Sequence, residues 1–204
     1  MMGRANLDRA FDPTPAPSYN VRHMALSTIS WQDVQHMPED GNRYEAIEGD
    51  LYMTPAPTVR HQRVMLRIYR ALHEILQEAG HGEVLCAPLG VEFPATGEGV
   101  QPDLLFVSHE RRGIIADAWL VGAPDLVVEI LSPSTSARDR GIKRRLYERQ
   151  GVREYWIVDP ENDAVDVWSF EDEPSHRRVT DVLTVAVGSE TAGEVDLGDV
   201  FSRE

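Results

Sequence analysis

The sequence predicts a mixed α/β fold in which a central β-sheet is flanked by helices. Two observations support this class. The order of hydrophobic patterns along the chain is strands, helix, several strands, helix and strands. In addition, residues 125–131 are apolar at both alternating positions except for Glu129, a pattern typical of a strand that is buried on both faces of a sheet.

Composition narrows the possible classes. A chain of 204 residues with 42% hydrophobic and 26% charged residues is typical of a globular protein, which excludes wholesale disorder, a collagen-like repeat and a disulfide scaffold. Cys86 is the only cysteine, so no intramolecular disulfide can form. No apolar run is long enough to span a membrane and no secretory signal is visible, so we expect a cytoplasmic protein.

The N-terminal residues 1–25 are expected to form a flexible tail, followed by one domain over residues 26–204. Prolines at positions 13, 15 and 17 prevent a helix or a central strand there. Met24 offers an alternative: translation begins at that residue, and the preceding segment is absent from the native protein.

In the first half of the chain, residues 31–35 are predicted to form a short helix capped by Ser30. Residues 43–53 read as two strands joined by a turn at residues 48–50. Residues 60–79 form the clearest helix and end at Gly80. Its apolar face is formed by Val64, Ile68, Leu72, Ile75 and Leu76.

In the second half, strands are expected at residues 82–87, 89–93, 102–107, 125–131, 154–158, 164–170 and 177–187, while residues 109–121 are ambiguous. Ser136 is expected to cap a helix that ends at Gly151, with Asp139 completing a capping box. The apolar segments 179–187 and 195–201 are expected either to complete the sheet or to form a dimer edge.

Two predicted strands carry carboxylates where apolar residues are expected. Asp103 lies in the strand 102–107 and Glu129 in the strand 125–131. Burying an ionised carboxylate without a partner is costly, so such residues usually have a function. If the strands are neighbours, the carboxylates converge, and converging carboxylates are typical ligands of Mg²⁺. The alternative is that each acid lies near a strand end, where it is solvated or pairs with an arginine.

Lys143 is the basic residue that helical spacing turns toward the sheet. Ile142, Leu146 and Tyr147 define the inward arc of its helix, and Lys143 lies inside it. An ammonium group beside metal-bound carboxylates can stabilise developing negative charge or orient an attacking water. The alternative is a lysine that extends along the helix edge to solvent. The five arginines of this helix are expected to lie outside the arc: Arg138, Arg140, Arg144, Arg145 and Arg149.

Two further side chains are candidates for the same site. His61 lies in the first turn of the helix 60–79, within its apolar arc, and is either a site residue or a hydrogen-bonded core histidine. Glu45 alternates with Ile47 on one face of its strand, whereas Glu48 falls in the turn. We therefore expect Glu45, rather than Glu48, to face the site.

Pro102-Asp103, Glu129 and a lysine on the following helix resemble the PD-(D/E)xK nuclease constellation. More narrowly, the chain resembles the Uma-two family of restriction-endonuclease-like proteins. One departure is that Leu131 stands where the simplest nuclease pattern has its lysine, so Lys143 takes that role in the resemblance. The matching stretches are residues 43–49, His61, residues 101–103, residues 124–135, Lys143 with Tyr147, and residues 151–160.

The resemblance implies a restriction-endonuclease-like fold and a metal-dependent endonuclease acting on DNA. It implies that Asp103 and Glu129 bind one Mg²⁺ or Mn²⁺, with the Ile130 carbonyl as an additional ligand. Lys143 is then the group that positions or activates water, assisted by His61 and Glu45. Because related nucleases that cut both strands of DNA usually form dimers, the resemblance also implies a homodimer.

The charge balance leaves the partner open. With 34 acidic and 20 basic residues, the formal net charge of −14 disfavours bulk attraction to nucleic acid, so DNA binding requires a local basic patch. Alternatives to a DNA endonuclease are a non-catalytic binding or assembly module and a phosphodiesterase acting on RNA or small nucleotides. Two arginine groups are either DNA contacts or solvated helix faces: Arg60, Arg63, Arg67 and Arg70 on the first helix, and the five arginines named above.

Overall fold

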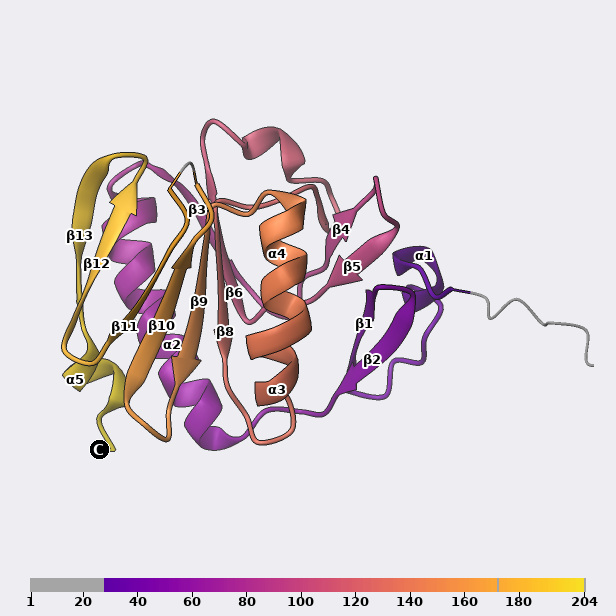
Figure 1. Ribbon diagram of the computed structural model, residues 1–204, viewed down its shortest axis with the longest axis horizontal. Coiled ribbons are helices and arrows are strands. Elements are labelled where there is room, and N and C mark those ends of the chain that lie inside the picture. Colours follow the sequence, from indigo (N-terminus) through magenta and orange to yellow (C-terminus); the bar gives the residue numbers. More distant parts are fainter. Residues whose placement is uncertain (1–27, 172, 204) are drawn as a thin grey trace, which may run out of the picture.

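The computed structural model describes residues 28–171 and 173–203. The predicted tail, and with it Met24, lies outside the described residues. The predicted fold class is confirmed: β-sheets are packed against helices in a mixed α/β arrangement (Figure 1). Among the helices that the structure describes, none is long and apolar enough to cross a membrane.

The central sheet has six strands in the order β11-β10-β9-β8-β6-β3. The pair β8–β9 is parallel, and the other neighbours are antiparallel. The strands of this sheet are β3 (Gly82–Cys86), β6 (Leu104–Ser108), β8 (Leu126–Ile130), β9 (Glu154–Asp159), β10 (Ala164–Ser169) and β11 (Ser175–Val179).

A five-stranded sheet and a separate hairpin complete the β-structure. The five-stranded sheet has the order β2-β1-β5-β4-β7, with β1 (Arg43–Ile47), β2 (Asp50–Thr54), β4 (Val91–Phe93), β5 (Glu98–Val100) and β7 (Leu120–Val121). The hairpin pairs β12 (Val182–Val187) with β13 (Glu190–Asp196). The short strand β5 was not predicted; its central residue is Gly99, and glycine is uncommon inside strands.

Both predicted long helices are present, but each contains a π-helical segment. The helix α2 (Val59–Leu72) continues as η1 (His73–Glu78), and α3 (Ser136–Arg138) continues through η3 (Asp139–Lys143) into α4 (Arg144–Gln150). The predicted capping box at Ser136 is wrong, because Ser136 is already helical and Asp139 is buried in η3. The remaining helical segments are α1 (Trp31–Val34), η2 (Arg112–Ile114) and α5 (Leu197–Phe201).

Alternate side chains along the central strands pack on opposite faces of the sheet, and both faces are buried. Leu104 and Phe106 pack toward α2 and the β12–β13 hairpin, whereas Leu105 and Val107 pack toward α4 and the five-stranded sheet. Figure 1 shows α2 and α4 on opposite sides of the strands. Because side chains alternate, Asp103 shares the α4 side with Leu105, as does Glu129 with Val127.

The C-terminal segment differs from the prediction. Residues 177–187 belong to two strands, β11 and β12, rather than one. Val195, Val200 and Phe201 are buried in the core cluster that includes α2, and α5 covers that helix instead of extending the sheet. Residues 195–201 therefore do not complete the central sheet, which was one of the two predicted alternatives.

We expect Gly99→Ala to reduce the free energy of unfolding by about 1–3 kcal/mol. An added Cβ at Gly99 would lie 2.3 Å from two ring atoms of Trp31, whose side chain is buried in a small core with Val34 and Ala46. Gly113→Ala is the matched control, since its Cβ meets nothing within 4 Å. Urea unfolding of both variants checks this. Equal stabilities of the two variants would contradict the expectation.

Candidate active site

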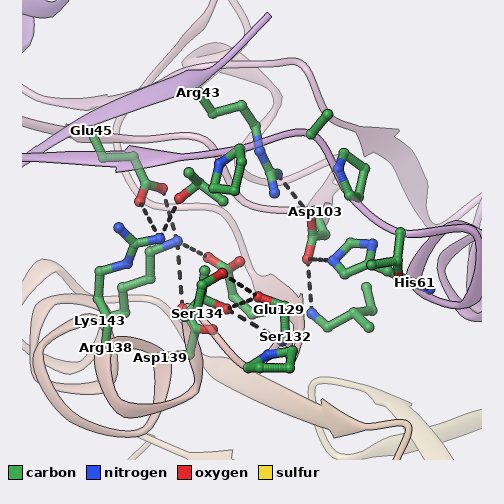
Figure 2. A pocket seen from close by; sticks show the side chains of 18 residues that line it. Arg43, Glu45, His61, Asp103, Glu129, Ser132, Ser134, Arg138, Asp139 and Lys143 are labelled. Carbon is green, nitrogen blue, oxygen red and sulfur yellow. Dashed lines mark hydrogen bonds and ion pairs between the residues drawn. The ribbon is translucent and has the colours of Figure 1, made fainter.

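The five predicted site residues line one pocket of about 190 Å³ at one edge of the central sheet. Figure 1 places the end of β8, the beginning of α2 and α3 together at this edge. The pocket is enclosed by these elements and by β1, β2 and the loops that follow β2 and β8 (Figure 2). The predicted residues in its lining are Glu45, His61, Asp103, Glu129 and Lys143, together with Ile130.

Asp103 immediately precedes β6 and is held from three directions. Its Oδ1 accepts a hydrogen bond from Arg43 at 2.8 Å, and its Oδ2 accepts one from the Ile130 amide at 2.8 Å. The His61 Nε2 lies 3.1 Å from the same Oδ2. Burial alone would raise the pKa of Asp103, but the His61 hydrogen bond and the Arg43 charge outweigh it and lower the pKa to about 2. The carboxyl group is therefore ionised at neutral pH.

Glu129 lies beside Asp103 because β6 and β8 are neighbours. Leu104 pairs with Val128 in antiparallel register, which confirms the predicted adjacency and sets the two acids on the same face. The Glu129 Oε1 accepts hydrogen bonds from Lys143 Nζ and from the Tyr147 hydroxyl, both at 2.8 Å. Burial, strengthened by nearby Asp139 and Asp103, raises the pKa of Glu129 to about 8 despite the opposing effect of Lys143.

Lys143 points inward, as predicted, and its Nζ lies between carboxylates. It is 2.8 Å from Glu45 Oε1, 2.8 Å from Glu129 Oε1 and 3.8 Å from Asp139 Oδ1 (Figure 2). Burial alone would lower its pKa, but the surrounding carboxylates raise it above the ordinary lysine value. The alternative of a lysine extending to solvent is excluded by its 3% exposed side chain.

The two glutamates of the first strand pair differ as predicted. Glu45 faces the pocket, where its Oε1 accepts a hydrogen bond from the Gln101 amide at 2.9 Å in addition to the contact with Lys143. Glu48 lies in the turn after β1 at a positive φ of 53°, and it pairs with Arg149. Only Glu45 is therefore placed to act with Lys143.

Three charged pocket residues were not predicted: Arg43, Arg138 and Asp139. Arg138 was expected to point outward, which is wrong. Its side chain donates to Thr54 Oγ1, lies 3.8 Å from Glu45 Oε2 and stacks over the Tyr52 ring. The prediction failed because η3 is π-helical, with bonds between residues five apart, so Arg138 and Lys143 face the same side. For Asp139, the sequence signal was its spacing, since it precedes Lys143 by four residues.

Negative charge exceeds positive charge in the pocket by one when all carboxyl groups are ionised and His61 is neutral. The acids are Glu45, Asp103, Glu129 and Asp139, and the permanent cations are Arg43, Arg138 and Lys143. Burial also raises the pKa of Asp139, although Lys143 opposes that effect. The surplus charge can be balanced either by a proton shared in this cluster or by a bound cation.

The raised pKa of Glu129 has a consequence for stability. A carboxyl group that binds a proton more tightly in the folded state stabilises the fold below its unfolded pKa, near 4.5, and this contribution is lost as the pH rises to about 8. Each unit of pKa difference is equivalent to about 1.4 kcal/mol. We therefore expect the free energy of unfolding to decrease between pH 5 and pH 8. Urea titrations across this range check it, and a flat profile would contradict it.

The donor chemistry of the pocket fits a hard divalent cation. Carboxylate oxygens predominate, and two of them, Glu45 Oε2 and Asp139 Oδ1, are buried without a hydrogen-bond partner. Within residues 28–171 and 173–203, no three His, Cys, Asp or Glu side chains form a ready group for a metal ion. Mg²⁺ does not need such a group, since it usually retains several waters and binds one or two carboxylates together with substrate phosphate.

Most of the arginines predicted to contact DNA are engaged within the protein. Arg60 and Arg67 donate to carbonyl groups of the C-terminal segment, and Arg60 also pairs with Asp163. On the other helix, Arg140 pairs with Asp159 and Asp166, Arg144 with Glu148, and Arg149 with Glu48 and Glu98. Among the arginines predicted to contact DNA, Arg63, Arg70 and Arg145 are exposed and have no ion pair with the described residues.

The fold and the acid-rich pocket between neighbouring strands together define a restriction-endonuclease-like α/β protein. The family model Uma2, described as "Putative restriction endonuclease", matches residues 31–194. The chain therefore belongs to this family, and the predicted resemblance is confirmed.

Two individual proteins are similar to the chain. A crystal structure titled as a putative nuclease from Anabaena variabilis ATCC 29413 superposes with a TM-score of 0.69 and 21% identity, covering 85% of this chain and 97% of that one. This likeness concerns the fold. An uncharacterized protein of Synechocystis sp., slr1290, is 25% identical over 146 residues, which are 71% of this chain and 73% of that protein.

Proposed function

We propose that the protein is a metal-dependent nuclease that hydrolyses phosphodiester bonds with Mg²⁺ or Mn²⁺. One observation carries the proposal: Asp103, immediately before β6, and Glu129, in the neighbouring strand β8, line one pocket in which Lys143 contacts Glu129 at 2.8 Å. The family and the nuclease-like fold support the same reaction class. The surplus negative charge in the pocket is consistent with a cation that neutralises it.

Asp103 and Glu129 are the residues proposed to hold the metal, with the Ile130 carbonyl as a further ligand. The metal would supply Lewis acidity, which lowers the pKa of a water and neutralises charge on phosphate. Lys143 would position the attacking water, since its Nζ already lies at hydrogen-bond distance from Glu129 and Glu45. Glu45 would orient this ammonium group, because its Oε1 is fixed by the Gln101 amide.

The remaining polar side chains are assigned to binding and orientation. Arg43 and His61 hold the Asp103 carboxylate in one orientation through opposite oxygens. Arg138 presents the second permanent cation that lines the pocket without contacting Asp103, and we propose that it binds a phosphate oxygen of the substrate. All of these groups are preorganised by contacts within the protein, which is the condition for electrostatic stabilisation of a phosphoryl transition state.

DNA is the proposed macromolecular substrate, and a homodimer is the proposed assembly. The exposed residues Arg63, Arg70 and Arg145 are the arginines proposed to contact phosphates. Because few basic groups are available and the net charge is −14, affinity should be modest and should fall steeply with salt. Sedimentation in solution tests the dimer.

Incubation of plasmid and single-stranded oligonucleotides with Mg²⁺ or Mn²⁺ tests the proposed function. Cleavage by the wild type, but not by Glu129→Ala or Lys143→Ala, supports it. Absence of cleavage by a folded wild type that also fails to bind metal in calorimetry overturns it and favours the binding or assembly module. Turnover of short nucleotides without cleavage of plasmid supports the phosphodiesterase alternative.

A further inference from the structure

A second cavity of about 200 Å³ adjoins the candidate active site. The two cavities share six lining residues, among them Arg43, His61 and Asp103. The second cavity lacks Glu129 and Lys143, and most of its wall is apolar. Three of its apolar residues, Pro55, Ala56 and Pro57, also line the first cavity. The apolar walls come from the loop after β2, from α2 and from the loop after β3: Pro55, Ala56, Pro57, Met65, Ala87 and Pro88.

The chemistry of this cavity differs from that of the acidic pocket beside it. Proline rings and the polarizable Met65 side chain form its walls, while Gln62 and Arg43 supply hydrogen-bonding groups at its boundary. A nucleobase has the same combination of properties, because its faces are apolar and its edge carries donors and acceptors. Enzymes that bind an unstacked base hold it between apolar side chains and read its edge with hydrogen bonds.

We propose that this cavity binds the nucleobase adjacent to the scissile phosphate, so that the nuclease acts on DNA whose base at the cleavage site is unpaired, as in a single strand. The inference rests on the proposed function, because it places the scissile phosphate beside Asp103. Asp103 borders both cavities, so a nucleotide with its phosphate in the acidic pocket has its base within reach of the second one. A base that remains stacked and paired in a duplex cannot enter such a cavity.

The arginines of α2 and α4 are consistent with the same substrate class, since only Arg63, Arg70 and Arg145 of those predicted to contact DNA are exposed without an ion pair to the described residues. Duplex binding without sequence readout depends on several phosphate contacts by free cations. Here Arg60 and Arg67 donate to carbonyl groups, and Arg140 and Arg149 are paired with carboxylates. A short or single-stranded ligand needs fewer phosphate contacts, because stacking of its bases supplies part of the affinity.

Calorimetry with three probes tests the inference: inorganic phosphate, ribose 5-phosphate and adenosine monophosphate, each in Mg²⁺ buffer. We expect the base-containing probe to bind about tenfold more tightly than ribose 5-phosphate. Gln62→Ala removes a hydrogen-bonding group from the exposed boundary of the second cavity alone, so it should reduce this advantage and leave the affinity for phosphate unchanged. Leu66→Ala is the matched control, since Leu66 is exposed on the same helix and lines neither cavity.

The outcomes separate this inference from the proposed function. Equal affinities for ribose 5-phosphate and adenosine monophosphate would overturn the base-binding cavity and leave the nuclease proposal standing. Binding of none of the three probes would overturn both. An oligonucleotide cleavage assay adds a second readout: faster cleavage of the single strand than of its duplex supports the inference, and the reverse order contradicts it.

Discussion

Lys143→Met is expected to lower the free energy of unfolding by about 3–5 kcal/mol and to abolish cleavage. The Lys143 side chain is 3% exposed, and its Nζ is 2.8 Å from both Glu45 and Glu129. Its removal leaves buried carboxylates without their shared cation. Breaking a buried ion pair from one side is destabilising because the remaining charge has neither water nor a partner.

A double-mutant cycle separates this electrostatic effect from lost packing. In the variant Lys143→Met with Glu45→Gln, one of the carboxylates that lost the ammonium group is removed, so part of the lost stability should return while cleavage stays absent. Urea unfolding and the plasmid assay measure the two properties. If the double variant is as unstable as the sum of the single variants, the lysine contributes through packing rather than through charge.

Glu129→Gln is expected to reduce cleavage at least about 100-fold without reducing stability at pH 8. Glutamine retains an acceptor for Lys143 and Tyr147, but it cannot carry the charge proposed to hold the metal. Because burial raises the pKa of Glu129 to about 8, ionisation of this carboxyl group opposes folding as the pH rises. The variant should therefore show a smaller decline in stability between pH 5 and pH 8 than the wild type.

Gln32→Glu adds a carboxylate at an exposed position on α1, whereas Glu129→Gln removes one. It controls for a general effect of charge on the assay. It should leave both cleavage and the pH profile unchanged. Retention of full cleavage by Glu129→Gln would remove this carboxyl group from the mechanism. An unchanged pH profile would show instead that its ionisation is not coupled to folding.

The positions of the two carboxylates could be predicted because they follow from the alternation of side chains in strands, and this alternation is visible in the sequence. Asp103 and Glu129 interrupt otherwise apolar segments, and period-2 geometry sets each on a definable face of the sheet. Glu45 was assigned to the site by the same argument, from its alternation with Ile47. His61 was found because the beginning of an amphipathic helix is equally periodic.

Irregular backbone limited the rest of the prediction. The π-helical segment η3 changes which side chains share a face, so Arg138 was assigned outward and Asp139 was assigned to a cap. Pairing of surface arginines was also not predictable, because Asp159, Asp163 and Asp166 are distant in sequence from the helices that they contact. The apolar walls of the adjoining cavity come from two loops and the helix α2, so no single sequence motif predicts this cavity.

Anomalous diffraction from a crystal soaked in Mn²⁺ tests the central claim most directly. The account predicts one anomalous peak within coordination distance of the Asp103 and Glu129 carboxylates, and its loss in Asp103→Asn. An Mn²⁺-saturated crystal with no peak in this pocket, or with a peak bound only to surface carboxylates, would contradict it.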